Sequence, residues 1–198
     1  MKILVACEES QAVTIELRKL GHEAYSCDIE ECSGGHPEWH LREDVLPLLE
    51  KEWDMIIAFP PCTYISNAGA RHLYPKGVLN EDRLKLGMEG KEFFMKFYNA
   101  KCDKIVIENP LPSKIYGLPQ HSQVIQPWQF GHPFKKRTQL WIKGMKQLEP
   151  TEIVEISENT KIPGNWFNKG GKERQKNRSK TFPGIAKAMA MQWAGECE

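Results

Sequence analysis

The sequence contains no run of about 18 apolar residues, the length that a helix needs to cross a bilayer. It also lacks the layout of a signal peptide, because Met1-Lys2-Ile3 leads directly into an apolar, strand-like segment. Its six cysteines include no Cys-x-x-Cys pair and no evenly spaced framework, which is typical of free thiols in a reducing compartment. We therefore expect a soluble, cytoplasmic protein with no membrane partner, in which cysteine chemistry is available for function.

Net charge is also nearly absent, at +1 over 198 residues, but the charge is unevenly distributed. Between Lys161 and Lys180 seven basic residues accompany a single acid, so this segment carries +6 and the rest of the chain carries −5. Trp166-Phe167 and Gly170-Gly171 lie in the same segment. Cations beside aromatic residues are typical of contacts with nucleic-acid phosphates and bases, although a solvated surface loop fits the pattern equally well.

Apolar runs of strand length alternate with segments of helical periodicity along the chain. Strands are predicted at residues 2–7, 22–27, 54–59, 104–107, 126–130 and 139–143. Helices are predicted at residues 11–20, with Ser10 as the N-cap, at 81–98 and at 185–193. The type of a further short element at 45–49 is left open. This alternation predicts one α/β domain over residues 1–198, with a mostly parallel sheet and helices on both faces.

The first predicted turn lacks the Gly-x-Gly pattern that brings a pyrophosphate close to the backbone in this class of sheet. Ala6-Cys7-Glu8-Glu9-Ser10 instead offers two acids, which disfavour a dinucleotide. Asp28 ends the second predicted strand about 20 residues later, where such sheets hold the ribose hydroxyls of a nucleotide-like cofactor. Acids suit a phosphate-free cofactor with a sulfonium and an ammonium group, such as S-adenosylmethionine. Asp44 is a candidate acceptor for its adenine amino group.

Two short motifs lie where predicted strands end, Phe59-Pro60-Pro61-Cys62 and Glu108-Asn109-Pro110. Because the carboxyl ends of parallel strands border the ligand crevice, we expect this thiol and this carboxylate to face one substrate. Together with Asp28, with Glu43-Asp44-Val45 and with the run from Lys135 to Gly144, these motifs resemble the DNA cytosine 5-methyltransferase family, in particular its short phage-encoded members. The similarity spans residues 1–144 and implies a Rossmann-like, S-adenosylmethionine-dependent methyltransferase fold.

The resemblance also implies site residues. The nucleophile falls on Cys62, the acid on Glu108 and a base-contacting arginine on Arg137. Contacts with S-adenosylmethionine fall on Ala6, Cys7, Glu8, Glu9, Asp28, Asp44, Phe59 and Pro60. Chemistry agrees with the first two roles, because carbon 5 of cytosine accepts a methyl group only after a thiolate adds at carbon 6, and a carboxyl group balances the resulting charge. Methyltransferases that act on exocyclic amines typically have a motif that resembles Asp-Pro-Pro-Tyr at this strand end. Here Phe59 and Cys62 stand in the places of its Asp and Tyr, which favours methylation of carbon over nitrogen.

Residues 145–181 form a short basic insert where the family usually holds a separate target-recognition domain. Reading a duplex sequence needs a surface of the order of 1,000 Å², which this insert cannot build alone. Action on single strands or free nucleotides, a separate specificity protein as partner, and a catalytically inactive nucleic-acid-binding protein therefore stay open. Residues 63–80 either close over a flipped base or form an ordinary surface connection. The predicted nucleic-acid contacts are Arg71, Lys169, Lys172, Arg174, Lys176, Arg178 and Lys180.

The spacing of Cys27, Cys32, His36 and His40 is close to that of structural zinc sites. Adjacent strand side chains point to opposite faces, however, and Cys27 belongs to a strand that continues into Asp28. We therefore predict no metal site, and a zinc-dependent module stays an alternative.

Overall fold

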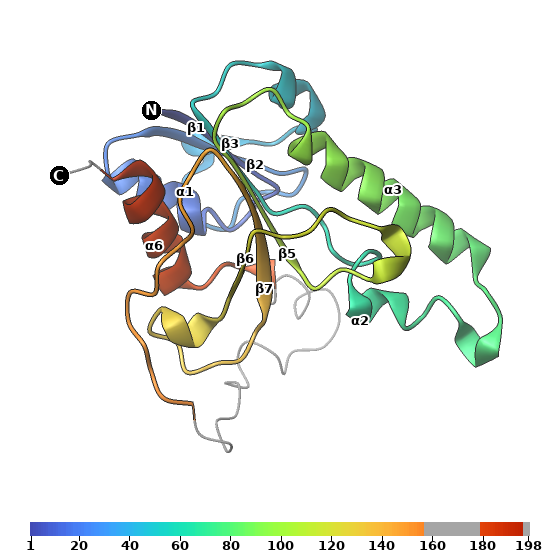
Figure 1. The fold of residues 1–198 in the computed structure, drawn as a ribbon. Coiled ribbons are helices and arrows are strands. Elements are labelled where there is room, and N and C mark those ends of the chain that lie inside the picture. The colour runs from blue at the N-terminus through green and yellow to red at the C-terminus, as the bar shows by residue number, and fades with distance from the viewer. Residues whose placement is uncertain (157–178, 196–198) are drawn as a thin grey trace.

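The computed structural model describes residues 1–156 and 179–195. In this part of the chain, strands form one seven-stranded sheet in the order β3-β2-β1-β4-β5-β7-β6 (Figure 1). Neighbours from β3 to β5 pair in parallel, whereas β7 is antiparallel to β5 and β6. The strands are β1 (Lys2–Ala6), β2 (Glu23–Cys27), β3 (His40–Leu41), β4 (Met55–Ala58), β5 (Ile105–Pro110), β6 (Gln123–Ile125) and β7 (Thr138–Lys143). The order from β3 to β5 is that of a Rossmann sheet, so the predicted α/β fold with a mostly parallel sheet is confirmed.

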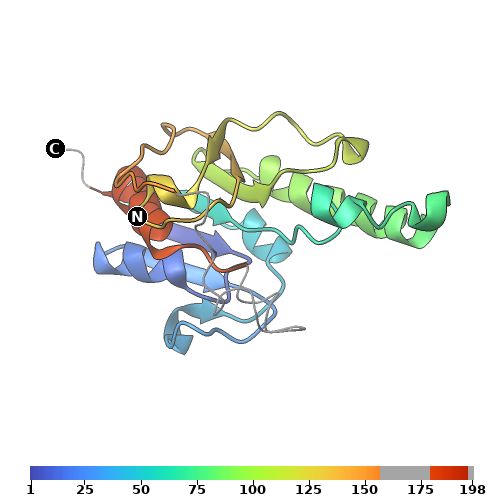
Figure 2. The same cartoon turned by 90° about the horizontal axis from the view of Figure 1, so that it is seen from below.

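Helices cover both faces of the sheet, as predicted. α1 (Ala12–Lys19) and α6 (Pro183–Ala194) lie side by side on one face, and α3 (Glu81–Tyr98) covers the other (Figures 1 and 2). Shorter helices occupy the loops: α2 (Asn67–Ala70) and the 3₁₀ helices η1 (Pro37–Trp39), η2 (Leu46–Glu50), η3 (Pro75–Gly77), η4 (Lys114–Tyr116) and η5 (Pro127–Gln129). None of the described helices combines the length and the apolar character that crossing a bilayer requires.

Side chains of the central strands alternate between two buried clusters, one on each face of the sheet. In β1, Ile3 and Val5 pack toward α1 and α6, whereas Leu4 packs toward α3. Such strands, apolar on both sides, are typical of a parallel sheet that helices cover twice. The same alternation along β5 places Glu108 on the α1–α6 face and Asn109 on the α3 face.

The turn between β1 and α1 differs from the prediction. Gln11, rather than Ser10, is the N-cap of α1; its backbone is left-handed, with φ 57°, and its side chain makes no capping bond. The Glu8 carboxylate caps the helix instead, because it accepts hydrogen bonds from the Val13 N–H at 2.7 Å and from the N–H and hydroxyl of Thr14 at 3.3 and 2.8 Å. A carboxylate at this position satisfies the unpaired donors and the positive end of the helix dipole.

Other short elements also differ from the prediction. Residues 126–130 contain η5 rather than a strand, and the edge strand β6 lies just before them. Pro127 cannot donate to a strand ladder, and the side-chain oxygen of Gln129 instead accepts a hydrogen bond of 2.7 Å from the N–H of Gln126. Residues 45–49 lie largely in η2, and β3 was not predicted, because two residues carry no periodicity.

Candidate active site

The two motifs lie next to each other at the carboxyl edge of the sheet: Phe59-Pro60-Pro61-Cys62 follows β4, whereas Glu108-Asn109-Pro110 forms the last three residues of β5, which extends beyond its predicted end at Ile107. β4 and β5 pair in parallel up to the residues that precede the motifs. The side-chain amide of Asn109 then donates a hydrogen bond of 3.0 Å to the backbone carbonyl of Pro60. This buried bond ties the loop that carries Cys62 to the strand end that carries Glu108.

Backbone hydrogen bonds fix the turn that follows Cys62. The Cys62 carbonyl accepts a bond of 3.0 Å from the N–H of Ser66, and the Ile65 carbonyl accepts one of 2.8 Å from the N–H of Ser113. Ser66 and Pro112 also form an isolated antiparallel bridge. The half-buried thiol of Cys62 therefore lies outside regular secondary structure, on a turn held against the loop after β5.

The environment of Glu108 favours its protonated form. Burial raises the pKa of the carboxyl group, against the opposing effects of the Lys136 charge and of a hydrogen bond with the Thr138 side chain. Thr138 opens β7 at the same edge of the sheet, opposite the last residue of β5. A carboxyl group that keeps its proton closer to neutral pH suits the donation of a proton or a hydrogen bond.

Lys136, next to the predicted Arg137, is the cation whose charge acts on Glu108. Side chains two residues apart share one side of an extended chain, and Lys136 lies two residues before Thr138. Its ammonium group lies 5.8 Å from the centre of the Phe182 ring, whereas the Arg137 side chain is exposed. The family resemblance identified Arg137 but not Lys136. The two-residue spacing between Lys136 and Thr138 was a signal that would have identified Lys136.

Acidic residues predicted for the cofactor gather at the ends of β1 and β2. Cys7 follows β1 and has a left-handed φ of 58°. Burial is the main cause that raises the pKa of its thiol, and the charges of Asp28, Cys27 and Asp44 raise it further. Burial also raises the pKa of Asp28, and the nearby Glu9 raises it further. The first turn and the two aspartates therefore lie within electrostatic reach of one another.

The remaining residues predicted for the cofactor have different surroundings. Glu8 is buried, its carboxylate caps α1, and burial raises its pKa to about 7. Both carboxylate oxygens of Glu9 are buried as well. Ala6 and Pro60 are buried, and the Ala6 carbonyl accepts a hydrogen bond of 2.9 Å from the N–H of Phe59. This last bond joins the acidic turn to the loop that carries the thiol.

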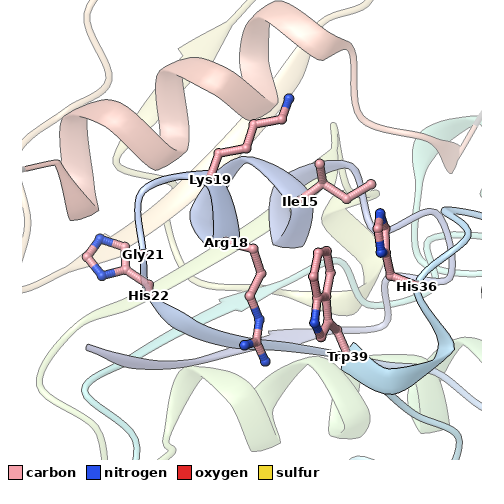
Figure 3. A pocket seen from close by; sticks show the side chains of 7 residues that line it. All are labelled: Ile15, Arg18, Lys19, Gly21, His22, His36 and Trp39. Carbon is pink, nitrogen blue, oxygen red and sulfur yellow. The ribbon is translucent and has the colours of Figure 1, made fainter.

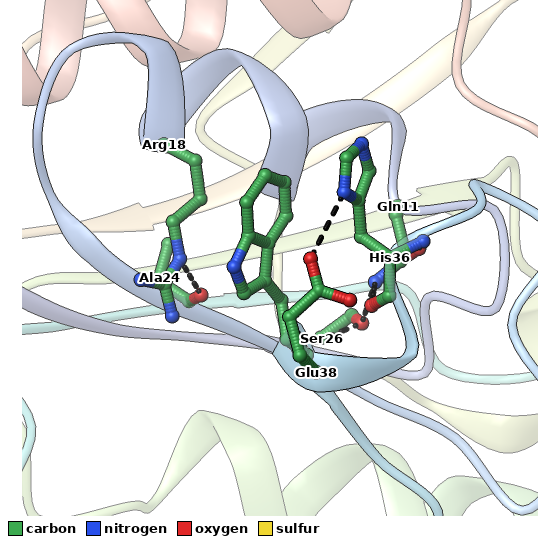
Figure 4. A network of polar contacts seen from close by, with 7 residues as sticks. Gln11, Arg18, Ala24, Ser26, His36 and Glu38 are labelled. Carbon is green, nitrogen blue, oxygen red and sulfur yellow. Dashed lines mark hydrogen bonds and ion pairs between the residues drawn. The ribbon is translucent and has the colours of Figure 1, made fainter.

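Gln11 anchors the loop after β2, which begins with Asp28. Its side-chain amide accepts a bond of 3.1 Å from the N–H of His36 and donates bonds of 2.8 Å to the His36 carbonyl and 3.2 Å to the Ser26 hydroxyl (Figure 4). The His36 ring stacks on Trp39 with 3.9 Å between centroids. These contacts hold the loop against the start of α1.

A shallow pocket lies beside this anchor, between α1, η1 and the turn before β2 (Figure 3). The Arg18 guanidinium lies over the rings of Tyr25 and Trp39, at 4.8 and 5.2 Å, and its Nε donates to the Ala24 carbonyl at 2.7 Å. Arg18 and His36 thus flank the Trp39 ring on its two sides. The pocket includes none of the predicted site residues, so we assign it a structural role.

Both histidines of the zinc alternative make other contacts. Both ring nitrogens of His40 are hydrogen-bonded, one to the Ser26 hydroxyl at 2.8 Å and one to the Glu30 carbonyl at 2.9 Å. The His36 ring lies 3.1 Å from the Glu38 carboxylate. In the described part of the chain, no three His, Cys, Asp or Glu side chains are arranged to hold a metal ion.

The predicted nucleic-acid contacts fall only partly on described residues. Arg71 is exposed at the end of α2, and its Nε donates to His72 at 2.9 Å. The half-buried Lys180 donates to the Ser33 hydroxyl at 3.1 Å. Residues 63–80 contain α2 and η3. Outside the described residues lie Lys169, Lys172, Arg174, Lys176 and Arg178, with most of the insert at 145–181.

Charge is sorted along the carboxyl edge of the sheet. Residues 7–11 and 28–39, which follow β1 and β2, contain six acids and no Lys or Arg. Residues 59–80, 111–122 and 131–137, which follow β4 and β5 and precede β7, contain six Lys or Arg and no acid. The acidic rim comprises Glu8, Glu9, Asp28, Glu30, Glu31 and Glu38. The cationic rim comprises Arg71, Lys76, Lys114, Lys135, Lys136 and Arg137.

Fold and site together define an α/β protein of Rossmann-like topology, with a thiol in the loop after β4 and a carboxyl group at the end of the neighbouring strand β5, between two rims of opposite charge. No protein-family model matches the chain, and a search of curated proteins found no match. The functional inference therefore depends on the chemistry of this edge.

Proposed function

We propose that the protein is a DNA (cytosine-5-)-methyltransferase that uses S-adenosylmethionine and attacks the base with Cys62. The observation that carries this proposal is the buried hydrogen bond from Asn109 to Pro60, which holds the Cys62 loop beside the strand end of Glu108. A soft nucleophile and a carboxyl group that retains its proton are the two groups that methylation of carbon 5 needs.

The acidic rim fits a positively charged, phosphate-free cofactor. Its acids oppose one another's ionisation, as the effect of Glu9 on the pKa of Asp28 illustrates, and a cationic ligand relieves that repulsion. S-adenosylmethionine, when bound, supplies an electrophilic methyl group. We assign Asp28 to the ribose hydroxyls, as is usual at the end of the second strand, Asp44 to the adenine amino group and Glu9 to the cationic groups.

Cys62 makes the first bond of the reaction. As a thiolate it adds to carbon 6 of cytosine, and the electron pair of the 5,6 double bond moves toward carbon 5 and the ring nitrogen. Glu108, whose pKa burial raises, donates to nitrogen 3 and stabilises the charge that develops there. Once carbon 5 has been methylated and has lost its proton to a base, the carbon–sulfur bond breaks and Cys62 is restored.

The same edge favours carbon rather than the exocyclic nitrogen as the target. A methyltransferase of amines needs a polar acceptor at the end of β4, where this chain has Phe59. The Phe59 side chain packs against the apolar cluster between the sheet and α1 and α6. It offers no acceptor to the amine, whereas Cys62 provides the nucleophile that carbon methylation requires.

Incubation with DNA and isotopically labelled S-adenosylmethionine, followed by mass spectrometry of the nucleosides, tests the proposal. We expect labelled 5-methylcytosine with the wild type and none with Cys62→Ala. Cys32→Ala is the matched control, because Cys32 is also a half-buried thiol but lies in the loop after β2. Unchanged labelling by Cys62→Ala would overturn the mechanism. Nucleic-acid binding without methylation by the wild type would support an inactive binding protein of this fold.

A further inference from the structure

The three loops that carry the cationic rim are joined by hydrogen bonds, although they are far apart in the sequence. Pro110 at the end of β5 pairs with Thr138, so the neighbouring Arg137 lies beside the loop after β5. That loop is joined to α2 by a hydrogen bond of 3.0 Å from the N–H of Asn67 to the Leu111 carbonyl. Figure 1 shows α2 and the η4 loop next to each other at the lower right. A ligand that follows this edge can therefore contact all three loops.

Tyr74 adds an aromatic ring to the rim. It is 53% exposed, although most large aromatic residues of the described chain are buried or half-buried. Arg71, His72 and Lys76 lie within three positions of it, and all of them are exposed. An open aromatic face among cations is the combination with which proteins hold single-stranded nucleic acid, because a base stacks on the ring while the cations contact phosphates.

Hydrogen bonds and burial hold the segment around Tyr74 against α2 and α3. The preceding Leu73 is fully buried, and its carbonyl accepts a hydrogen bond of 2.8 Å from the N–H of Asn80. Arg83 of α3 donates two bonds, of 3.1 and 2.9 Å, to the carbonyl of Gly69 in α2. A platform that is already ordered loses little conformational entropy when it binds a ligand.

The backbone of Lys76 points to the same use. Its φ of 55° and ψ of 26° are left-handed, a conformation that costs a non-glycine residue about 1–2 kcal/mol. The exposed lysine side chain gains no burial that offsets this cost. Strain of this kind is concentrated at ligand-binding loops, where it fixes the direction of a functional side chain.

We propose that the cationic rim binds one strand of single-stranded nucleic acid, with a base stacked on Tyr74 and phosphates on the surrounding Lys and Arg side chains. A duplex fits this surface poorly, because the four residues of α2 and the three of η3 form no helix long enough to read a major groove. Paired bases also expose no face for stacking on Tyr74. The inferred binding does not itself depend on the proposed function. Only its purpose, the delivery of a base to Cys62, rests on that function.

Fluorescence anisotropy with labelled oligonucleotides, in the absence of a methyl donor, tests the proposal. The probes are a single strand of about 12 nucleotides and the duplex of the same sequence. We expect the single strand to bind more tightly, and Tyr74→Ala to weaken its binding about 5- to 100-fold, the loss expected for one stacked base. Tyr74→Phe keeps the ring and is expected to bind like the wild type.

A triple variant tests the charges. Lys76→Gly, Lys114→Ala and Lys135→Ala remove three exposed cations, and the glycine also relieves the left-handed strain. The slope of log affinity against log salt should shrink by about 2, because each phosphate contact on a single strand contributes about 0.7. The matched control removes three exposed cations that lie toward the amino ends of β4 and β5: Lys51→Ala, Lys96→Ala and Lys101→Ala. It should keep the wild-type slope.

Tighter binding of the duplex, unchanged affinity in Tyr74→Ala or equal salt slopes in the two triple variants would each overturn the proposal. Failure of the proposed function looks different: the wild type would bind the single strand in the expected way and transfer no labelled methyl group.

Discussion

The two rims differ in charge and, in part, in burial. At the acidic rim, Glu8 is buried and Asp28 is half-buried, and burial raises the pKa of both, whereas Glu30, Glu31 and Glu38 are exposed. At the cationic rim, Lys136 is half-buried and the other five cations are exposed. Desolvated acids interact strongly with a small cation that they enclose, whereas exposed cations act through screened attraction on an extended polyanion. The difference therefore matches two ligands of opposite charge and different size, a cationic methyl donor and a nucleic-acid strand.

The boundary between the rims follows the topology of the sheet. β1 lies between β2 and β4, at the point where the strand order reverses and where such sheets place their ligands. The hydrogen bond from the Phe59 N–H to the Ala6 carbonyl crosses this boundary. Cys62 follows three residues later, so the proposed nucleophile belongs to the loop that starts where the two rims meet.

We expect the largest effect from substitution of Glu108, the acid on which the charge of Lys136 in the cationic rim acts. Glu108→Gln keeps the shape of the side chain and removes the transferable proton, so the methylation rate should fall about 10²- to 10⁴-fold. Single-turnover assays with labelled methyl donor measure the loss. Single-strand affinity should stay at the wild-type value, because Glu108 is not part of the cationic rim. A variant that methylates at the wild-type rate would remove Glu108 from the mechanism.

A second large effect tests the burial of the acidic rim at Glu8. Its pKa is about 7 in the folded protein, against an ordinary value of 4.5, so the folded state binds this proton more tightly than the unfolded chain. The group therefore favours folding below pH 4.5, and this contribution is lost as the pH rises through 7. Relative to Glu8→Gln, the wild type should lose about 3 kcal/mol of stability over that interval.

Urea unfolding at several pH values measures this difference. Glu92→Gln, an exposed position on α3, is the control and should show no such trend. A difference between wild type and Glu8→Gln that does not change with pH would show that the carboxyl group is not desolvated.

The structure also shows which features a sequence pattern can specify. α3 has the predicted bounds, because Asn80 accepts a hydrogen bond from the Arg83 N–H and so caps a clearly periodic segment. The cap of α1 was not predictable in this way. It depends on the left-handed backbone of Gln11, which brings the Glu8 carboxylate to the helix start, and no periodicity specifies that turn.

At the candidate site, the same distinction holds. The neighbouring positions of the Cys62 loop and of the end of β5, which carries Glu108, follow from the parallel pairing of β4 and β5, which the alternation of strands and helices predicts. The effect of Lys136 on Glu108 depends on the register of β7, an antiparallel strand whose pairing begins at Thr138. A resemblance in sequence order cannot determine which of two adjacent cations points to the acid.

An intermediate effect is expected where the acidic rim contacts the methyl donor. Asp28→Asn removes the charged acceptor for the ribose hydroxyls, so the affinity for S-adenosylmethionine should fall about 10- to 100-fold, the usual cost of losing hydrogen bonds to a charged group. Isothermal titration calorimetry measures it. Glu52→Gln, an exposed acid that precedes β4 and lies outside the acidic rim, is the control and should bind normally. Equal affinities for the two variants would contradict the assignment of the cofactor to this rim.

The smallest expected effect concerns the electrostatic influence of Lys136 on Glu108. Because the Lys136 charge lowers a pKa that burial raises, Lys136→Met should raise the pKa of Glu108 further. The carboxyl group would then stay protonated to a higher pH, and the midpoint of its titration would move to higher pH. Carbon-13 NMR of glutamate-labelled protein, with Glu108→Gln for assignment, follows this shift without any need for activity. Lys135→Met removes the exposed neighbouring charge and should leave the titration in place. Equal titrations in the two variants would mean that the charge of Lys136 has no influence on the ionisation of Glu108.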